Sequence, residues 1–144
     1  MNYENFKRKI MKIISQQQAL KSMLALLIAV ILFHLSVFFQ IIPYTIVWAG
    51  KLNNVQEMRV FESVSLLICI FHITVLLLKG NYIKNKIPTI IINIVLWGFV
   101  ALFILNTVGN LFAKSSFELY FFTPLTFISA LLSLRILLGK KSSF

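Results

Sequence analysis

SMLALLIAVILFHLSVFFQII (residues 22–42) is an uncharged stretch of twenty-one residues, of which fourteen are Leu, Ile, Val or Phe. An α-helix rises 1.5 Å per residue, so about 20 residues cross the ~30 Å hydrocarbon core of a bilayer. These apolar residues outweigh the cost of placing His34, Ser36 and Gln40 in lipid. We predict a membrane-spanning helix that ends at Pro43. We expect this helix to be retained in the mature protein, because the run is too long for the apolar core of a signal peptide and no cleavage-site pattern follows it.

Three further apolar runs have the length of a membrane span, at residues 58–78, 87–111 and 118–138. The connections between them are short, and short connections place successive helices side by side and antiparallel. The apolar runs are continuous instead of alternating, which excludes a β-barrel. The sequence therefore predicts an all-α fold, an integral membrane four-helix antiparallel bundle that forms a single domain over residues 1–144.

The composition agrees with a membrane protein and excludes several other classes. Hydrophobic residues make up 59% of the 144 residues and charged residues 12%, and a chain this short cannot hide so much apolar surface in one aqueous core. Cys69 is the only cysteine, so the chain has no internal disulfide and no cysteine zinc site. The two histidines lie at different depths, and a tetrahedral metal site needs three or four converging ligands. We expect no metal, no cofactor and no catalytic constellation.

The positive charges are distributed unevenly along the chain. Eleven of the fourteen Lys and Arg residues lie before the first span, between the second and third spans, or at the C-terminal end, whereas Lys51, Arg59 and Lys114 lie on the opposite side. The positive-inside rule then places both termini in the cytoplasm, which we expect to be that of a bacterium, with the spans in its inner membrane. Basic groups beside apolar runs indicate anionic lipid headgroups as partners and not nucleic acid.

Residues 3–14 have the pattern of an amphipathic helix. Apolar residues recur at helical spacing, and four basic residues lie largely on the other face. Such a helix lies in the plane of the headgroups. We expect a membrane anchor at this position, although a docking surface for a protein partner has the same pattern.

Glu62 is the candidate functional residue with the strongest physical argument, because ionisable groups inside a bilayer are costly. It lies about one turn inside the outer end of the second span, three residues after Arg59. Cys69 and His72 continue the same helical face inward. Two interpretations remain open: an interfacial carboxylate paired with Arg59, or a buried acid in a ligand pocket. The chain offers no second intramembrane carboxylate near Glu62.

Several other polar side chains are expected at the same outer depth. Asn106 and Asn110 are four residues apart near the end of the third span, where carboxamides either bridge helices or line a pocket. His34 lies near the middle of the first span and is interpreted either as a hydrogen-bonded core histidine or as a ligand. We predict a polar pocket open to the outer leaflet, with these candidate residues: Glu62, Asn106, Asn110, Arg59, Trp48, Lys51 and His34.

Two stretches deserve comparison with known families, IPYTIVWAGKL (42–52) and LNTVGNLFAK (105–114). With these stretches, four spans and basic ends, the chain resembles a group of small bacterial inner-membrane proteins of uncharacterised activity. The four-helix layout is more distantly similar to the DoxX-like and emopamil-binding-protein-like families. The shared sequence feature is the Gly-Lys-Leu of the first outer loop, Gly50, Lys51 and Leu52. Resemblance to the second of these implies membrane acids and histidines that bind or isomerise sterol-like ligands.

Three functional hypotheses follow. The first is a non-enzymatic membrane protein, either a binder of lipid or another hydrophobic ligand or an accessory subunit of a larger complex. The second is a proton-coupled transporter or channel that uses Glu62 and works as a homo-oligomer. The third is a membrane enzyme acting on a lipid or isoprenoid. Against it, the sequence shows no candidate nucleophile with a base at useful spacing.

Overall fold

The computed structural model describes residue 5 and residues 14–139, and it confirms an all-helical chain with four long apolar helices. The long helices are α2 (Gln16–Phe38), α3 (Val55–Lys79), α4 (Thr89–Leu111) and α5 (Thr123–Leu138), the last preceded by a π-helical segment η3 (Glu118–Phe122). Each of the four segments, with η3 and α5 taken together, is long and apolar enough to cross a membrane. The predicted amphipathic helix at 3–14 lies outside the described residues, apart from Asn5 and Ile14.

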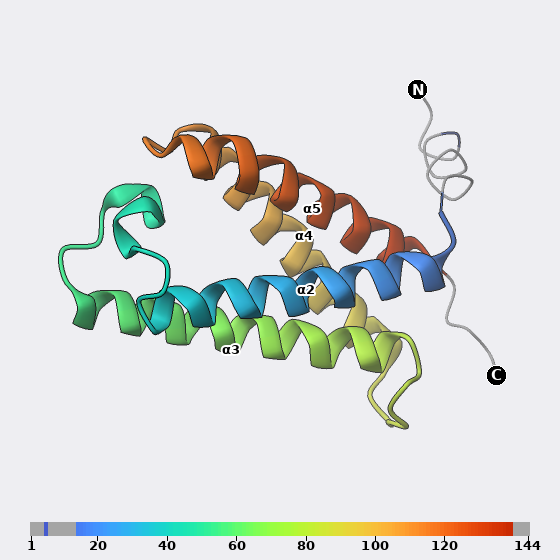
Figure 1. Cartoon of the computed structure of the whole chain (residues 1–144). Helices are drawn as coiled ribbons and strands as arrows, with labels where there is room; N and C mark the ends of the chain where they lie inside the picture. Colours follow the sequence, from blue (N-terminus) through green and yellow to red (C-terminus); the bar gives the residue numbers. More distant parts are fainter. Residues whose placement is uncertain (1–4, 6–13, 140–144) are drawn as a thin grey trace.

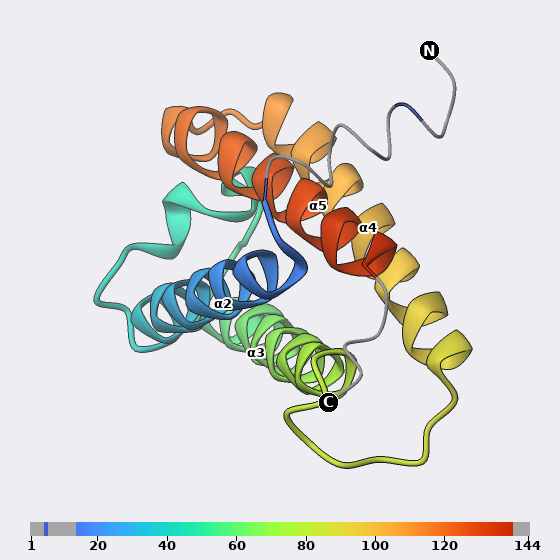
Figure 2. The same ribbon diagram turned by 90° about the vertical axis from the view of Figure 1, so that its right-hand side faces the viewer.

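The helices form two hairpins, α2 with α3 and α4 with α5, and α2 also contacts α5 (Figure 1). Turned by 90°, the α4–α5 pair lies to one side of the α2–α3 pair (Figure 2). We call the end that holds Phe38, Val55, Leu111 and Glu118 the loop end, because the connection 39–54 folds over it. The opposite end, with Gln16, Lys79, Thr89 and Leu138, is called the termini end.

The first span begins six residues earlier than predicted and ends four residues earlier. Ser15 and Gln18 form a capping box: the Ser15 hydroxyl accepts the Gln18 N–H at 3.1 Å, and the Gln18 side chain accepts the Ser15 N–H at 2.9 Å. This cap starts the helix at Gln16. At the other end Gln40 has φ 61°, a left-handed conformation that terminates helices. Pro43 therefore does not end the helix.

The other boundaries lie closer to the predictions. The Asn54 side chain accepts the Glu57 N–H at 2.8 Å and starts α3 at Val55 instead of residue 58. The fourth span is the predicted 118–138, but its first five residues form η3. Pro124 is the second residue of α5 and has no N–H to donate into the preceding turn, so the irregular segment lies where its ring would disturb an α-helix.

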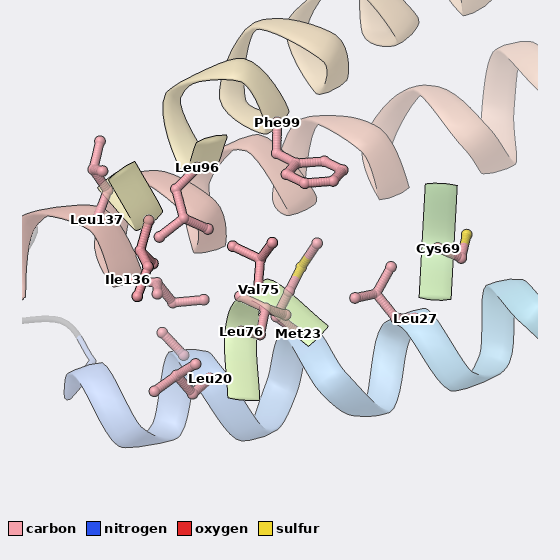
Figure 3. Close-up of a cluster of buried hydrophobic side chains, with 12 residues drawn as sticks. Leu20, Met23, Leu27, Cys69, Val75, Leu76, Leu96, Phe99, Ile136 and Leu137 are labelled. Atoms are coloured by element: carbon pink, nitrogen blue, oxygen red, sulfur yellow. The ribbon is translucent and has the colours of Figure 1, made fainter. Parts of the chain in front are cut away.

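The buried core lies mainly toward the termini end. It joins all four helices through aliphatic side chains, Cys69 and Phe99 (Figure 3). A second, smaller cluster of Val37, Val47 and Met58 lies beneath the loop 39–54. Large apolar side chains remain exposed along the helices, among them Ile28, Leu105 and Phe127. A soluble protein rarely leaves so much contiguous apolar surface uncovered.

Candidate functional site

Glu62 is the centre of a buried polar cluster near the loop end. Its side chain is 1% exposed. The Oε2 of Glu62 lies 2.6 Å from Nδ1 of His34, and the indole N–H of Trp48 donates to Oε1 at 2.9 Å. Each carboxylate oxygen thus has a partner from a different element, α2 on one side and the loop on the other. The sequence-predicted residues Glu62, His34 and Trp48 are brought together in this cluster.

The helix hairpin explains why His34 meets Glu62. His34 is four residues before the last residue of α2, and Glu62 is seven residues after the first residue of α3. Because the two helices run antiparallel and in contact, residues one to two turns from the shared end face one another. The carboxylate would be costly in apolar surroundings without such partners. The cluster therefore links α2, α3 and the loop.

The loop reaches Glu62 through an unusual backbone. Trp48, Ala49 and Gly50 have φ values of 55°, 55° and 64°, so three consecutive residues are left-handed. Only glycine adopts this region freely, and other L-residues pay about 1–2 kcal/mol each. Strain of this kind persists only where the surroundings hold the backbone in place. The indole of Trp48 also contacts Phe61 edge-on, with ring centroids 4.9 Å apart.

A second buried carboxylate, Glu118, holds the same turn. Glu118 is 6% exposed, and its two oxygens accept the N–H of Ala49 at 3.0 and 2.9 Å. Glu62 and Glu118 therefore bind adjacent residues of one turn, Trp48 and Ala49. The sequence did offer a signal for Glu118: it is an acid at the first residue of the fourth span, at the depth of the loop.

An aromatic group lies beside these acids. The ring of Phe33 contacts the ring of Phe122 edge-on at 4.9 Å and lies 6.1 Å from that of Phe117. Phe117 in turn stacks on Phe121 at 5.2 Å. The rings come from α2 and from the segment that carries Glu118. Phe33 and Phe117 are therefore adjacent in the chain to His34 and Glu118, at the loop end.

The remaining predicted residues do not join Glu62. Asn106 is exposed on α4 and Asn110 is half-buried, while Lys51 is exposed. Arg59 is exposed and its guanidinium lies 6.0 Å from the centre of the Phe38 ring. Among the hydrogen bonds of the described chain, none links Glu62 to any of these four residues. On α4 it is instead Thr107 that bonds to a neighbouring helix, through its hydroxyl and that of Thr126 at 2.9 Å.

The two residues that continue the face of Glu62 along α3, Cys69 and His72, are also buried. Cys69 is 8% exposed and His72 is 1% exposed. The ring of His72 stacks on Phe99, with centroids 3.8 Å apart and planes 9° from parallel. Neither ring nitrogen has a hydrogen-bond partner in the described structure. In residues 14–139 no group of three or more His, Cys, Asp or Glu side chains could hold a metal ion.

A scan against protein-family models finds no matching family, and comparisons with curated proteins and with solved structures find no similar protein.

Proposed function

We propose that this chain is a multi-pass integral protein of a bacterial inner membrane, with the loop end outside and the termini end in the cytoplasm. Four helices of sufficient length and apolar surface support insertion. The bias of Lys and Arg toward the termini end supports this orientation. The loop 39–54 then lies at the level of the outer leaflet.

The proposed function is to bind an amphipathic ligand at the loop end, one with an apolar chain and a head group that is cationic or donates hydrogen bonds. The observation that carries this proposal is that both buried carboxylates accept hydrogen bonds from the loop 39–54. Glu62 accepts from the Trp48 indole, and Glu118 accepts from the Ala49 amide. Both donors are neutral and belong to a strained turn, so a ligand head group with stronger donors can replace them. The turn would act as a lid over the two acids.

The aromatic group supplies a place for the apolar part of such a ligand. Phe117 and Phe121 are stacked and substantially exposed beside Glu118. Ring faces attract cations as well as alkyl chains, whereas they offer nothing to an anion. Two acids and several rings together favour a cationic amphiphile over an anionic one.

Tryptophan quenching tests the proposal. The chain has two tryptophans, and Trp97 is exposed on α4, so a Trp97→Phe background leaves Trp48 as the only one. We expect a brominated long-chain alkylammonium to quench Trp48 saturably in detergent micelles. Glu118→Gln removes one charged acceptor and should raise the apparent Kd about tenfold or more, the effect of losing one charge-assisted hydrogen bond.

Two controls make the result specific. Glu57→Gln removes a charge at the same end, but Glu57 bonds to Asn53 and Asn54 and touches neither Trp48 nor Ala49. This variant should have the same apparent Kd as the parent. The matching brominated alkyl sulfonate should quench weakly. Equal quenching by the sulfonate and the ammonium, or equal weakening by both glutamine variants, would refute the proposal.

A second candidate function, proton-coupled transport, is favoured by the 2.6 Å contact between His34 and Glu62. A carboxylate and an imidazole at this distance can exchange a proton between α2 and α3. Proteoliposomes loaded with a pH-sensitive dye distinguish the two candidates. A transporter would move protons when the alkylammonium is added and would stop in Glu62→Gln, whereas a binding protein would leave the internal pH unchanged.

A further inference from the structure

One side of α4 is not covered by any other part of the described chain. Figure 2 shows α4 at the edge of the molecule, and its contacts with other helices are mainly with α5. Gly98, Asn106 and Gly109 are exposed, and Leu102 is half-buried. Successive residues of an α-helix are about 100° apart, so these four lie within about 80° of one another. We call them the Asn106 face.

Asn106 places a carboxamide without a partner on this face. Among the hydrogen bonds of the described residues none involves its side chain, whereas the neighbouring Thr107 bonds to Thr126. Asn106 is six residues from Val100, the middle residue of α4. Six residues rise about 9 Å, and each half of the hydrocarbon core is about 15 Å thick. An asparagine is too short to reach the headgroups from this depth as a lysine does, so lipid alone leaves its amide unsatisfied.

Two glycines flank Asn106 along the helix. A Cβ at Gly98 or at Gly109 would meet no atom within 4 Å, so packing within the described chain does not require glycine at either position. Glycine also weakens a helix relative to alanine. Between membrane helices, however, small residues let two backbones approach closely. The two glycines are eleven residues apart, which is close to three turns, and they therefore mark one line along the exposed side of α4.

The charge of α4 also favours association with an identical helix. α4 contains no Asp, Glu, Lys or Arg. Two copies of it can therefore approach without the repulsion that like charges would cause. The hydrogen-bonding groups are complementary as well, because a carboxamide has both donors and an acceptor.

We propose that the Asn106 face binds the same face of a second copy of this chain. Copies inserted in one orientation are related by a two-fold axis along the membrane normal, so their α4 helices run parallel and equivalent residues meet at one depth. The amide N–H of Asn106 then donates to the carbonyl oxygen of its counterpart in the second copy. The interaction requires insertion in a bilayer, but it depends neither on the loop-end ligand nor on which end is outside.

Energy transfer between labelled copies in phosphatidylcholine liposomes tests the proposal. The full-length chain with Cys69→Ala and Lys84→Cys has one cysteine, in the exposed connection after α3, for a donor or an acceptor dye. Only protein that floats with the liposomes is measured, so a failure of insertion is detected separately. We expect energy transfer that increases with the protein-to-lipid ratio, saturates, and varies linearly with the acceptor fraction, as a dimer requires.

Variants of the Asn106 face should weaken the dimer. Asn106→Leu should raise its dissociation constant about fivefold or more, the effect of one lost hydrogen bond between membrane helices. Asn106→Gln keeps a carboxamide and should restore most of the association. Gly98→Leu has room in the monomer but should weaken the dimer by keeping the two backbones apart. Asn106→Leu makes the lipid-facing surface more apolar, so the loss of association cannot result from a destabilised monomer.

Two controls make the result specific to this face. Ser63→Leu replaces an exposed polar side chain by leucine on α3 and should leave the dissociation constant unchanged. In the Cys69→Ala chain, oxidation should link copies through Gly109→Cys but not through Val108→Cys, which lies at nearly the same depth and points about 100° away. A monomer in liposomes, equal weakening by Ser63→Leu and Asn106→Leu, or equal cross-linking at both positions overturns the proposal. A monomer would assign the face to lipid or to a different protein.

Discussion

Ala49 has a backbone conformation that is unfavourable for a residue with a side chain. Its N–H is bound by both oxygens of Glu118, but its φ of 55° is one that alanine rarely adopts. The following residue, Gly50, has a similar φ without the same cost. The hydrogen bonds to Glu118 therefore hold a conformation that residue 49 itself does not favour.

Ala49→Gly is expected to stabilise the protein by about 1 kcal/mol, because glycine removes the left-handed strain and keeps the N–H that Glu118 accepts. The measurement is the thermal unfolding midpoint followed by circular dichroism in one detergent. Ala101→Gly on the exposed face of α4 is the control, and it should lower stability by about 1 kcal/mol, the usual cost of glycine in a helix. A loss of stability in both variants would contradict the assignment of strain to Ala49.

His72 permits a second prediction at this scale. Its ring is buried and stacked on Phe99, and both nitrogens lack hydrogen-bond partners in the described structure. His72→Phe removes two unsatisfied polar atoms and keeps an aromatic ring in the stack, so we expect a gain of about 1 kcal/mol. The same unfolding experiment measures it. A clear loss of stability would mean that a polar partner, such as a buried water, binds His72.

At the scale of the element, the stability of α2 depends on the hydrogen bonds that cap its first turn. The capping box of Ser15 and Gln18 begins the helix in polar surroundings, before the apolar run starts. We expect Ser15→Ala to cost about 1 kcal/mol, whereas Ser15→Asp should retain most of the stability because an aspartate caps as well as a serine. Ser22→Ala, an exposed site within the same helix, is the control and should be near neutral. Equal effects at both serines would refute the role of the cap.

The sequence predicts the four helices well because each apolar run has the length that a span requires. The depth of a side chain follows from the helix bounds, and His34, expected near the middle of the first span, lies four residues from the end of α2 and meets Glu62 there because that helix ends at Phe38. The direction in which a residue points is harder to predict. In α4 apolar residues occupy every side, so no polar face indicates that Asn106 is exposed while Thr107 contacts α5. Glu118 was missed because its contact depends on the conformation of a loop.

At the scale of the whole molecule, charge is separated along the helices. In the described chain the buried acids Glu62 and Glu118 lie toward the loop end, whereas the buried cations Lys79 and Arg135 lie at the termini end. A bilayer with anionic lipid on its inner side would favour one orientation of such a molecule. The acidic site beneath the loop therefore lies at the end opposite the buried cations.

The orientation itself is the last prediction. Eleven Lys and Arg residues flank the spans at the termini end and three flank them at the loop end, so the positive-inside rule places the loop end outside. Reporter fusions after Lys51 and after Lys114 should report the outer side, and a fusion after Lys84 should report the cytoplasm. Neutralising Lys84 and Lys86 alone should leave this pattern intact, because the basic residues before the first span remain and the first helix usually dominates. A fusion after Lys84 that reports the outer side would reverse the orientation, and it would place the acidic site beneath the loop in the cytoplasm.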